Sequence, residues 1–236
     1  MAHLEPLSPT PRTRPNRSRA RAQSDRAALR DTLDGGLICH LGVVVDDAPR
    51  VLPTAYGVDW AGDDPYGTLY LHGSVAAHSL RAAPTQTVCV TVTIVDGLVL
   101  ARSAFHHSAN YRSAVVLGQP RLVTDDSERR RALDLIIEHL VPGRAPTMRP
   151  HTRKELAATA VLALSLREAS VKVRSGDPVD EPFDVEAGGV WAGVLPIRVV
   201  TDPPVTAQDS PPGVPVPDHV TARALSEGAP RLAPSR

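Results

Sequence analysis

Two polar stretches of the chain hold the side chains best suited to bind an anionic cofactor. The first, residues 68–81, runs from an apolar strand pattern through Gly73 into a short helix expected to open near Ser74. A helix N-terminus presents unpaired N–H groups and the positive end of the helix dipole, which suit a phosphate. A strand-to-helix connection with Ser74 as an ordinary N-cap explains the same residues without a ligand. Four side chains add hydrogen-bond donors there: Ser74, His78, Ser79 and Arg81.

The second stretch, residues 101–112, is the denser of the two. Arg102 shares a predicted strand face with Leu98 and Leu100, and a guanidinium buried there is costly unless an anion or another acceptor meets it. This density indicates a ligand site, and a surface loop with an internal salt bridge is the alternative. The hydrogen-bonding side chains that follow Arg102 are Ser103, His106, Asn110, Tyr111 and Arg112.

A third group of residues can present hydroxyl and backbone groups to a flat heteroaromatic ligand. By themselves the threonines of this group are β-favouring residues and decide nothing. The group comprises Thr91 and Thr93 of one predicted strand and Pro53, Thr54 and Tyr56 of another.

Several common catalytic and metal-binding patterns are missing from the sequence. It contains no Gly-x-Ser-x-Gly elbow, no P-loop, no Gly-x-Gly-x-x-Gly fingerprint and no His-Glu-x-x-His. His106 and His107 are adjacent, so on a strand their side chains point to opposite faces and cannot share one ion. Two cysteines, Cys39 and Cys89, are too few for a disulfide framework or a four-cysteine zinc site. We therefore expect no metal site.

The hydrophobic pattern in the middle of the chain is mostly that of β-strands. Asp96-Gly97 is a dipeptide typical of a two-residue hairpin turn. Six or seven strands joined by short turns indicate a mainly β fold with a few helices, a small barrel or sandwich. Helices are predicted over residues 25–34, 126–140 and 152–159, the last with Thr152 and Glu155 at capping-box spacing. Strands are predicted over residues 37–45, 50–56, 68–72, 88–95, 98–105, 113–123 and 161–173.

Composition separates one folded domain, residues 24–200, from two tails. Residues 1–23 hold five arginines, four prolines and almost no apolar side chains, so they are predicted to be a disordered leader without the apolar core of a secretory signal. Residues 201–236 hold eight prolines and are predicted to be an extended, disordered tail.

The charge balance and the apolar runs limit the partners. Lys+Arg 26 equals Asp+Glu 26, and this neutrality argues against a nucleic-acid or anionic-lipid partner. No apolar run reaches the roughly 18–20 residues that a membrane span needs. We therefore expect a cytoplasmic protein with neither a nucleic-acid nor a membrane partner.

Seven short phrases between residues 26 and 197 occur in an order typical of one protein family. They are 39–42 (CHLG), 51–57 (VLPTAYG), 69–74 (LYLHGS), 88–93 (VCVTVT), 96–108 (DGLVLARSAFHHS), 110–113 (NYRS) and 191–196 (WAGVLP). Together they resemble the pyridoxamine 5′-phosphate oxidase-like flavoproteins, in the branch with the nitroimidazole-resistance and flavin-nucleotide-binding proteins. The resemblance implies a split β-barrel that forms a homodimer and holds FMN in clefts between its two subunits.

By this resemblance, residues 74–81 would bind the FMN phosphate, and the other polar stretches would line the ring system and the ribityl chain. Family members often have Ser-Arg after the helix start, whereas this chain has Ala77-His78. A neutral histidine is a weaker phosphate partner than arginine, so Arg81, Arg102 or Arg112 would supply the charge. The implied cofactor-binding residues are Pro53, Thr54, Tyr56, His72, Ser74, His78, Ser79, Arg81, Thr91, Thr93, Arg102, Ser103, His106, Asn110 and Arg112.

The family resemblance also implies the function. We expect an FMN-dependent oxidoreductase that passes hydride or electrons through flavin N5 between a reduced nicotinamide donor, NADH or NADPH, and a small molecule. His106 and Tyr111 are the expected proton-transfer helpers, because His titrates near neutrality. The alternatives are a non-catalytic flavin-binding or sensing protein, the same barrel with a deazaflavin or a haem, and a dimeric scaffold without a ligand.

Overall fold

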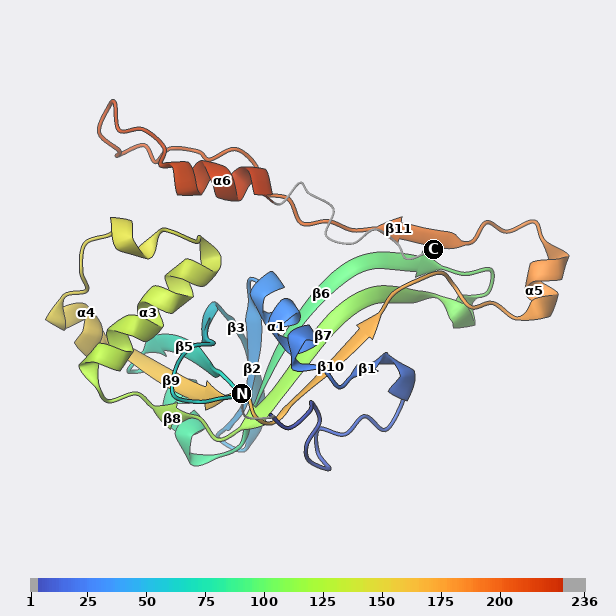
Figure 1. The fold of residues 1–236 in the computed structure, drawn as a ribbon, viewed down its shortest axis with the longest axis horizontal. Coiled ribbons are helices and arrows are strands. Elements are labelled where there is room, and N and C mark those ends of the chain that lie inside the picture. The colour runs from blue at the N-terminus through green and yellow to red at the C-terminus, as the bar shows by residue number, and fades with distance from the viewer. Residues whose placement is uncertain (1–3, 227–236) are drawn as a thin grey trace.

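Two antiparallel sheets form the centre of the fold, and they share one apolar core (Figure 1). The computed structural model describes residues 4–226. Sheet A has the order β1-β10-β7-β6-β2-β3, with β11 added beside β6, and sheet B has the order β4-β5-β9-β8. Sheet A contains β1 (Ala22–Gln23), β2 (Cys39–Val45), β3 (Ala48–Thr54), β6 (Val88–Leu100), β7 (Ser108–Gly118), β10 (Ala169–Arg174) and β11 (Gly193–Pro196). Sheet B contains β4 (Tyr56–Asp59), β5 (Thr68–Ser74), β8 (Arg121–Leu122) and β9 (Thr159–Ser165).

The helices begin where the sequence supplies capping side chains. The Asp25 and Asp125 carboxylates accept hydrogen bonds from the N–H groups of the first turns of α1 and α3. The predicted capping box of Thr152 and Glu155 opens α4. The α-helices are α1 (Arg26–Gly35), α2 (His78–Ala82), α3 (Asp126–Leu140), α4 (Arg153–Ala158), α5 (Pro182–Ala187) and α6 (Asp218–Ser226). The short 3₁₀ helices are η1 (Arg19–Arg21), η2 (Ala83–Thr85), η3 (Ala104–His106) and η4 (Ala145–Thr147).

The main core lies between the facing sides of the two sheets and α1. The strand predicted over residues 88–95 is part of β6 and has one buried face, because Val88, Val90 and Val92 are each 1% exposed while Thr93 on the other face is exposed. They belong to the same buried cluster as Leu69 of β5. The hydrophobic effect stabilises such side chains by roughly 1.5–3 kcal/mol each when they are fully buried.

A second, smaller core joins α3 to the outer face of sheet B. It contains Tyr70 and Val161 of the sheet and Ile136 of the helix. Gly57 makes this approach possible, because a Cβ at this position would lie 2.6 Å from the backbone nitrogen of Ile136. The helix can therefore lie directly on β4 only while residue 57 has no side chain.

Strand β6 continues through the point where a hairpin turn was predicted. The ladder between β6 and β7 has a bulge between Val95 and Gly97 and then resumes, so the prediction of a turn at Asp96-Gly97 was wrong. Arg112 of β7 clamps the bulge, with its Nε 3.0 Å and its Nη2 2.8 Å from the two Asp96 carboxylate oxygens. The chain turns instead after Leu100 through η3.

The extra length of β6 and β7 creates an arm, defined here as residues 97–110 and 175–196. Figure 1 shows it extending away from the side of the molecule that carries α3 and α4. β11 pairs with β6 along this arm, from Gly193 opposite Leu100 to Pro196 opposite Gly97.

Three other predicted strands divide differently because the chain changes sheets. The predicted strand over residues 161–173 is two strands: β9 in sheet B and β10 in sheet A. The predicted strand over residues 113–123 likewise splits into the end of β7 and the short β8. Tyr56 belongs to β4 of sheet B, whereas the residues before Ala55 belong to β3 of sheet A. A continuous apolar pattern does not reveal such corners.

The described part of the N-terminal segment lies against the domain and is not the disordered leader that was predicted. Leu7 is 5% exposed and belongs to the main core, and the N–H of Ser8 donates to the Ala169 carbonyl oxygen over 2.8 Å. Arg12 forms an ion pair with Glu168. Composition missed this segment because residues far away in the chain attach it: Arg12 pairs with Glu168, Glu5 pairs with Arg167, and β1 pairs with β10.

The C-terminal tail also contains more structure than was predicted. Residues 201–217 have no helix or strand, but α6 follows them. A Cβ on Gly143, after α3, would lie 3.2 Å from the Cβ of His219, so α6 approaches the end of α3. Residues 227–236 of the predicted tail lie outside the described residues. None of the helices between residues 4 and 226 is long and apolar enough to cross a membrane.

Candidate functional site

The predicted phosphate-binding turn joins β5 to α2, but its helix begins later than predicted. α2 starts at His78, and its N-cap is Ala77, which offers no side-chain cap. The Ser74 hydroxyl instead accepts a hydrogen bond from the Ala76 N–H over 3.2 Å, so Ser74 shapes the turn and does not cap the helix. Because α2 has only five residues, any anion bound here depends mainly on side chains.

Arg81 is the charged side chain that this turn leaves available. It is exposed and forms no ion pair within residues 4–226. Leu80 beside it is 7% exposed and anchors α2 in the core. Gly73 serves this packing, because a Cβ there would lie 2.6 Å from Leu80 Cδ1. Gly73 therefore makes room for α2.

A cavity of about 390 Å³ opens beside this turn and is called the α2 cavity here. Apolar side chains form most of its wall, and its two charged residues, Arg81 and Arg129, are both cationic. The two Nη atoms of Arg129 lie 3.3 Å from the carbonyl oxygens of Leu156 and Val123, and its Nε is buried without a partner. The lining residues are Val75, Leu80, Arg81, Pro84, Leu122, Val123, Arg129, Ala157, Thr159 and Ala160.

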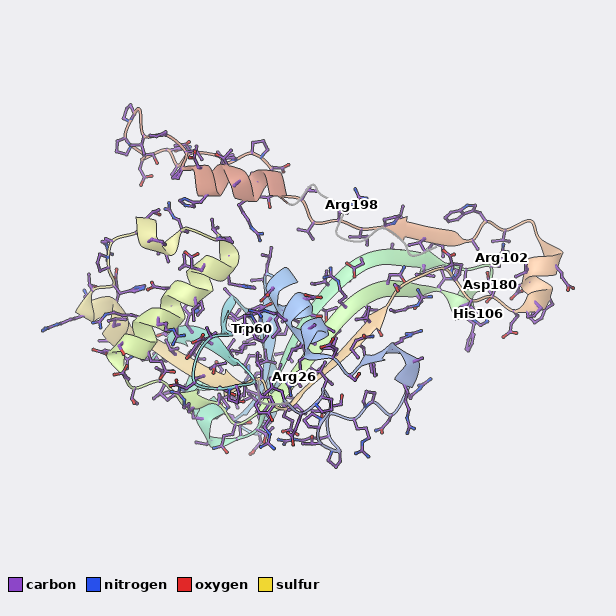
Figure 2. All side chains as sticks on the ribbon, viewed as in Figure 1. Arg26, Trp60, Arg102, His106, Asp180 and Arg198 are labelled. Carbon is purple, nitrogen blue, oxygen red and sulfur yellow. The ribbon has the colours of Figure 1, made fainter. Side chains whose placement is uncertain are left out.

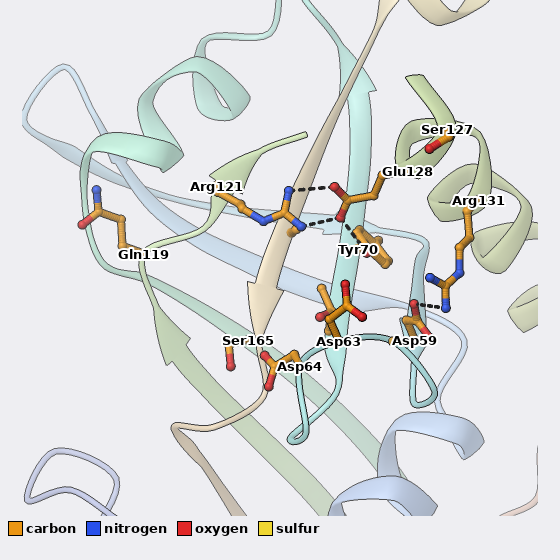
Figure 3. Close-up of a pocket in the computed structure, with 13 residues that line it drawn as sticks. Asp59, Asp63, Asp64, Tyr70, Gln119, Arg121, Ser127, Glu128, Arg131 and Ser165 are labelled. Carbon is orange, nitrogen blue, oxygen red and sulfur yellow. Dashed lines mark hydrogen bonds and ion pairs between the residues drawn. The ribbon is translucent and has the colours of Figure 1, made fainter. Parts of the chain in front are cut away.

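A second cavity, of about 590 Å³, lies at the opposite end of sheet B and is rich in carboxylates (Figure 3). Four acidic side chains line it: Asp59, Asp63, Asp64 and Glu128. Asp59 forms an ion pair with Arg131, and Glu128 forms one with Arg121. This cavity, called the acidic cavity here, would repel a phosphate.

Two of the four carboxylates of the acidic cavity, Asp59 and Glu128, pair with arginines of the same chain. Hydrogen bonds from the Arg121 guanidinium hold the pKa of Glu128 below its usual value. The Tyr70 hydroxyl donates to the Glu128 carboxylate over 2.8 Å, and burial first, then that carboxylate, raise the pKa of Tyr70. No part of this cavity was predicted as a site, and its residues act mainly to fasten α3 to sheet B.

Arg102 meets its acceptor inside the same chain. Its Nη1 lies 2.8 Å from Asp180 Oδ2, and its backbone N–H donates to Asp180 Oδ1 over 2.9 Å. The Asp180 side chain is 2% exposed. Figure 2 shows the two residues at the arm, with His106 close by. The internal salt bridge that was the alternative interpretation is therefore present, and Arg102 is not free for a phosphate in this conformation.

The other predicted polar residues of this stretch also hold the arm together. Arg112 is bound to Asp96, as described above. Asn110 is 8% exposed, and its Nδ2 donates to the Gly176 carbonyl oxygen over 3.1 Å. His106 Nε2 lies 3.6 Å from a Glu181 carboxylate oxygen. Ser103 differs, because its hydroxyl is buried and has no partner among the described residues.

The outer face of sheet A brings other predicted residues into one row. Pro53 of β3 pairs with His40 of β2, and His40 pairs with Thr91 of β6, so the three side chains share a face. The Thr93 hydroxyl lies 3.2 Å from the hydroxyl of Ser113 on the next strand. His40 was not among the predicted site residues. It is exposed between the buried Cys39 and Leu41, and that alternation could have identified it.

Tyr56 and His72 have different roles, although both were predicted to bind the cofactor. Tyr56 is fully buried, and its hydroxyl lies 2.5 Å and 2.9 Å from the carbonyl oxygens of Leu33 and Gly36. It is a core residue and does not line an open site. His72 is half-buried, and its Nδ1 is buried without a partner. Burial lowers the pKa of His72, so its imidazole is neutral at pH 7.

Metal-binding side chains do not gather in the described part of the chain. Between residues 4 and 226, no three His, Cys, Asp or Glu side chains are arranged to hold a metal ion. The two thiols, Cys39 and Cys89, are both free, and burial raises the pKa of Cys39 to about 12. Neither thiol is therefore suited to act as a nucleophile at pH 7.

Comparisons with known proteins place this architecture in a family. A model of the pyridoxamine 5′-phosphate oxidase family matches residues 25–173. The structure of the flavocytochrome Anf3 from Azotobacter vinelandii is 37% identical, with a TM-score of 0.84 over 92% of this chain and 99% of that one. The FAD and heme binding protein from Mycobacterium smegmatis is 36% identical, with a TM-score of 0.78 over 86% of this chain and 97% of that one.

A more distant structure shares the fold alone. A 5-nitroimidazole antibiotic resistance protein from Bacteroides thetaiotaomicron, described as putative, is 21% identical with a TM-score of 0.52, over 64% of this chain and 86% of that one. No curated protein matched the sequence. The family match over residues 25–173, together with two relatives above one-third identity along most of the chain, shows that this protein belongs to the pyridoxamine 5′-phosphate oxidase-like family.

Proposed function

We propose that this protein is a flavin-binding redox protein that also binds a haem. One observation carries the proposal: two relatives that are 37% and 36% identical are a flavocytochrome and an FAD and heme binding protein. The family model ends at residue 173, whereas the first of these matches covers 92% of the chain. The similarity therefore extends into the arm or the terminal segments, outside the part common to the family.

The flavin site that we propose uses the turn before α2 and the outer face of sheet A. Arg81 is exposed and has no ion pair in the described structure, so its guanidinium can hold a phosphate without breaking an existing contact. The row of Pro53, His40 and Thr91 gives hydrogen-bonding groups beside a flat surface. A bound flavin supplies electron and hydride transfer, while the residues of the chain bind it and orient it.

For the haem, we propose His72 as the axial ligand. Haem iron is commonly held by a neutral imidazole, and burial keeps His72 neutral at pH 7. In residues 4–226 its ring makes no hydrogen bond, and its Nδ1 is buried without a partner. Most other described histidines either bond to the chain or are exposed, for example His139, whose Nε2 lies 2.6 Å from the Gly36 carbonyl oxygen. His219 also has an unpartnered nitrogen, but it lies on α6, far along the chain from the proposed flavin turn.

A second copy of the chain completes the site in this proposal. Both faces of β3 are exposed, including Val51 at 66%. The arm exposes Phe105 at 89% and both Phe183 and Trp191 at 68%. These are both phenylalanines and one of the two tryptophans of the chain. Large exposed apolar surface marks an interface, and a homodimer with the flavin between its subunits would bury it.

Turnover belongs to the same proposal. We infer an oxidoreductase that takes electrons from NADH or NADPH and passes them to a small molecule. His106, beside Glu181, and Tyr111 remain the proposed proton-transfer residues. A flavin carrier or sensor without turnover is the competing function.

The purified full-length protein tests the flavin, the haem and the reductase activity that we propose. We expect a yellow protein with a Soret band, whose flavin and haem are released and quantified by chromatography and the pyridine haemochrome assay. Bleaching of the flavin absorbance by NADH or NADPH would support a reductase, whereas a flavin that stays oxidised with both would favour the carrier. A colourless protein that takes up neither cofactor would refute the proposal.

A further inference from the structure

We propose that the α2 cavity binds the adenylate half of a flavin dinucleotide, so that the chain selects FAD over FMN. This inference rests on the proposed flavin site at the turn before α2. Val75 of that turn and Arg81 of α2 both line the cavity. A ligand whose first phosphate is held by Arg81 can therefore continue directly into the cavity.

The chemistry of the wall fits an adenosine phosphate. Leu80, Pro84 and Leu122 give apolar surface on which a flat heteroaromatic ring can pack. The volume of about 390 Å³ falls within the roughly 300–1,000 Å³ typical of small-molecule sites. FMN lacks the adenylate group, so it would leave this cavity unused.

Charge distinguishes this cavity from the other one. The α2 cavity has two arginines and no carboxylate in its wall. The acidic cavity has four carboxylates and two arginines, both of which form ion pairs there. A pyrophosphate is attracted to the first and repelled by the second, so of these two cavities the α2 cavity suits the dinucleotide.

Arg129 is the second arginine in the wall of the α2 cavity, and we assign it to the phosphate of the adenylate group. Its side chain is 20% exposed, and its Nη atoms are fixed by the backbone oxygens of Leu156 and Val123. Its Nε is buried and has no partner in the described structure. Asp126, its nearest carboxylate at 3.4 Å, is 63% exposed, so solvent screens that pair and leaves positive charge toward the cavity.

Two neighbouring alanines of α4 allow a matched test. Ala157 and Ala158 are both exposed, but only Ala157 lines the cavity. Ala157→Phe would fill the cavity, and Ala158→Phe adds the same side chain outside its wall. We would remove the flavin from each full-length protein and titrate it with FAD and with FMN, following flavin fluorescence.

We expect the wild-type protein to bind FAD at least tenfold more tightly than FMN. Ala157→Phe should abolish that preference by weakening FAD at least tenfold while changing FMN less than twofold, and Ala158→Phe should keep it. Leu122→Glu is a second variant at a half-exposed position, and the added carboxylate should lower FAD affinity in the same selective way.

The outcomes separate this inference from the proposed function. A wild-type protein that binds FMN and FAD equally, or an Ala157→Phe variant with unchanged FAD affinity, would overturn the adenylate site while leaving flavin binding intact. Loss of haem from Ala157→Phe with the FAD preference unchanged would also overturn it, by assigning the cavity to the haem. Failure of the wild-type protein to bind any flavin would instead refute the proposed function.

Discussion

Asp180 accepts hydrogen bonds from both the backbone N–H and the guanidinium of Arg102, over 2.9 Å and 2.8 Å. This contact joins the turn after β6 to the segment before α5, which are 78 positions apart in the chain. Burial alone would raise the pKa of Asp180, but the two hydrogen bonds and the charge of Arg102 together hold it below its usual value. The carboxylate therefore stays charged and keeps the two parts of the arm together.

The pair predicts that Arg102→Ala and Asp180→Ala will have the same effect. Each should loosen residues 175–193 from residues 97–110 within the arm, which limited proteolysis and hydrogen exchange will detect as faster cleavage and faster amide exchange. Flavin affinity should fall equally in both variants, because both lose the same contact. A large loss of affinity in Arg102→Ala with none in Asp180→Ala would show instead that the guanidinium contacts the flavin directly.

Arg81 should be the main cationic contact of the flavin phosphate in the proposed site. Replacing it with alanine removes the charge that we assign to the phosphate, and we expect FAD and FMN affinity to fall together by about tenfold, roughly 1.4 kcal/mol. Arg81→Lys should retain part of the affinity. Arg153 is an exposed arginine on α4 outside both cavities, so Arg153→Ala is the control and should bind normally.

His72→Ala should lose the haem and keep the flavin. The measurement is the ratio of Soret to flavin absorbance in the purified protein, together with restoration of the Soret band by added imidazole. His151→Ala provides the control, because that ring already bonds to Asp134 over 3.0 Å. A normal haem content in His72→Ala would exclude His72 as the ligand and direct attention to His219.

Stability should fall when the pH drops below about 6.5. Burial lowers the pKa of His139 from 6.5, more than its hydrogen bond to Gly36 raises it. Between the lowered pKa and about 6.5, the unfolded chain binds more protons than the folded chain, so acid favours unfolding, and the stability is complete only above this range. Urea unfolding at pH 7.5, 6.5 and 5.5 measures how the free energy of unfolding changes with pH.

The His139→Gln variant isolates this residue, because glutamine does not titrate. Its free energy of unfolding should depend less on pH than that of the wild-type protein. Part of the slope should remain, since burial also lowers the pKa of His72. An unchanged slope in His139→Gln would contradict the assignment.

The exposed aromatics of the arm predict a dimer that a single charge can weaken. Trp191→Asp and Phe105→Asp should shift the protein toward monomer in analytical ultracentrifugation and lower its flavin content, because the site would lose its second subunit. Val205 is 95% exposed but lies in the tail, outside the arm. Val205→Asp should leave the assembly unchanged, and a wild-type monomer would refute the dimer.

Local signals in the sequence predicted three helices well, α1, α3 and α4, and the strand connections poorly. α3 has the predicted bounds because its Asp125 cap and its apolar spacing are both local. The Asp96-Gly97 dipeptide is also a local signal, but distant contacts overrule it: Arg112 clamps the bulge and β11 pairs with the strand beyond it. No window of neighbouring residues contains that information.

In the candidate site too, the sequence predicted what neighbouring residues determine and missed what depends on residues far apart in the chain. The turn with Ser74 and Arg81 was predicted because a strand, a glycine and donors follow one another in sequence. The partner of Arg102 could not be named, because nothing near Arg102 points to Asp180. The α2 cavity was missed for a similar reason: its wall combines α2, β8, α3 and α4, which come together only in the folded chain.

Strand β6 runs from the core between the two sheets into the arm, and its ladder with β7 resumes beyond the bulge. Val90 lies in the core and Leu98 on the arm, and one strand carries both, with its bulge fixed by Arg112 and Asp96. No loop separates Val90 from Leu98, because β6 is one strand from Val88 to Leu100. In the proposed dimer, contacts between protomers at the far end of β6 would therefore also influence the position of Thr91 in the proposed flavin site.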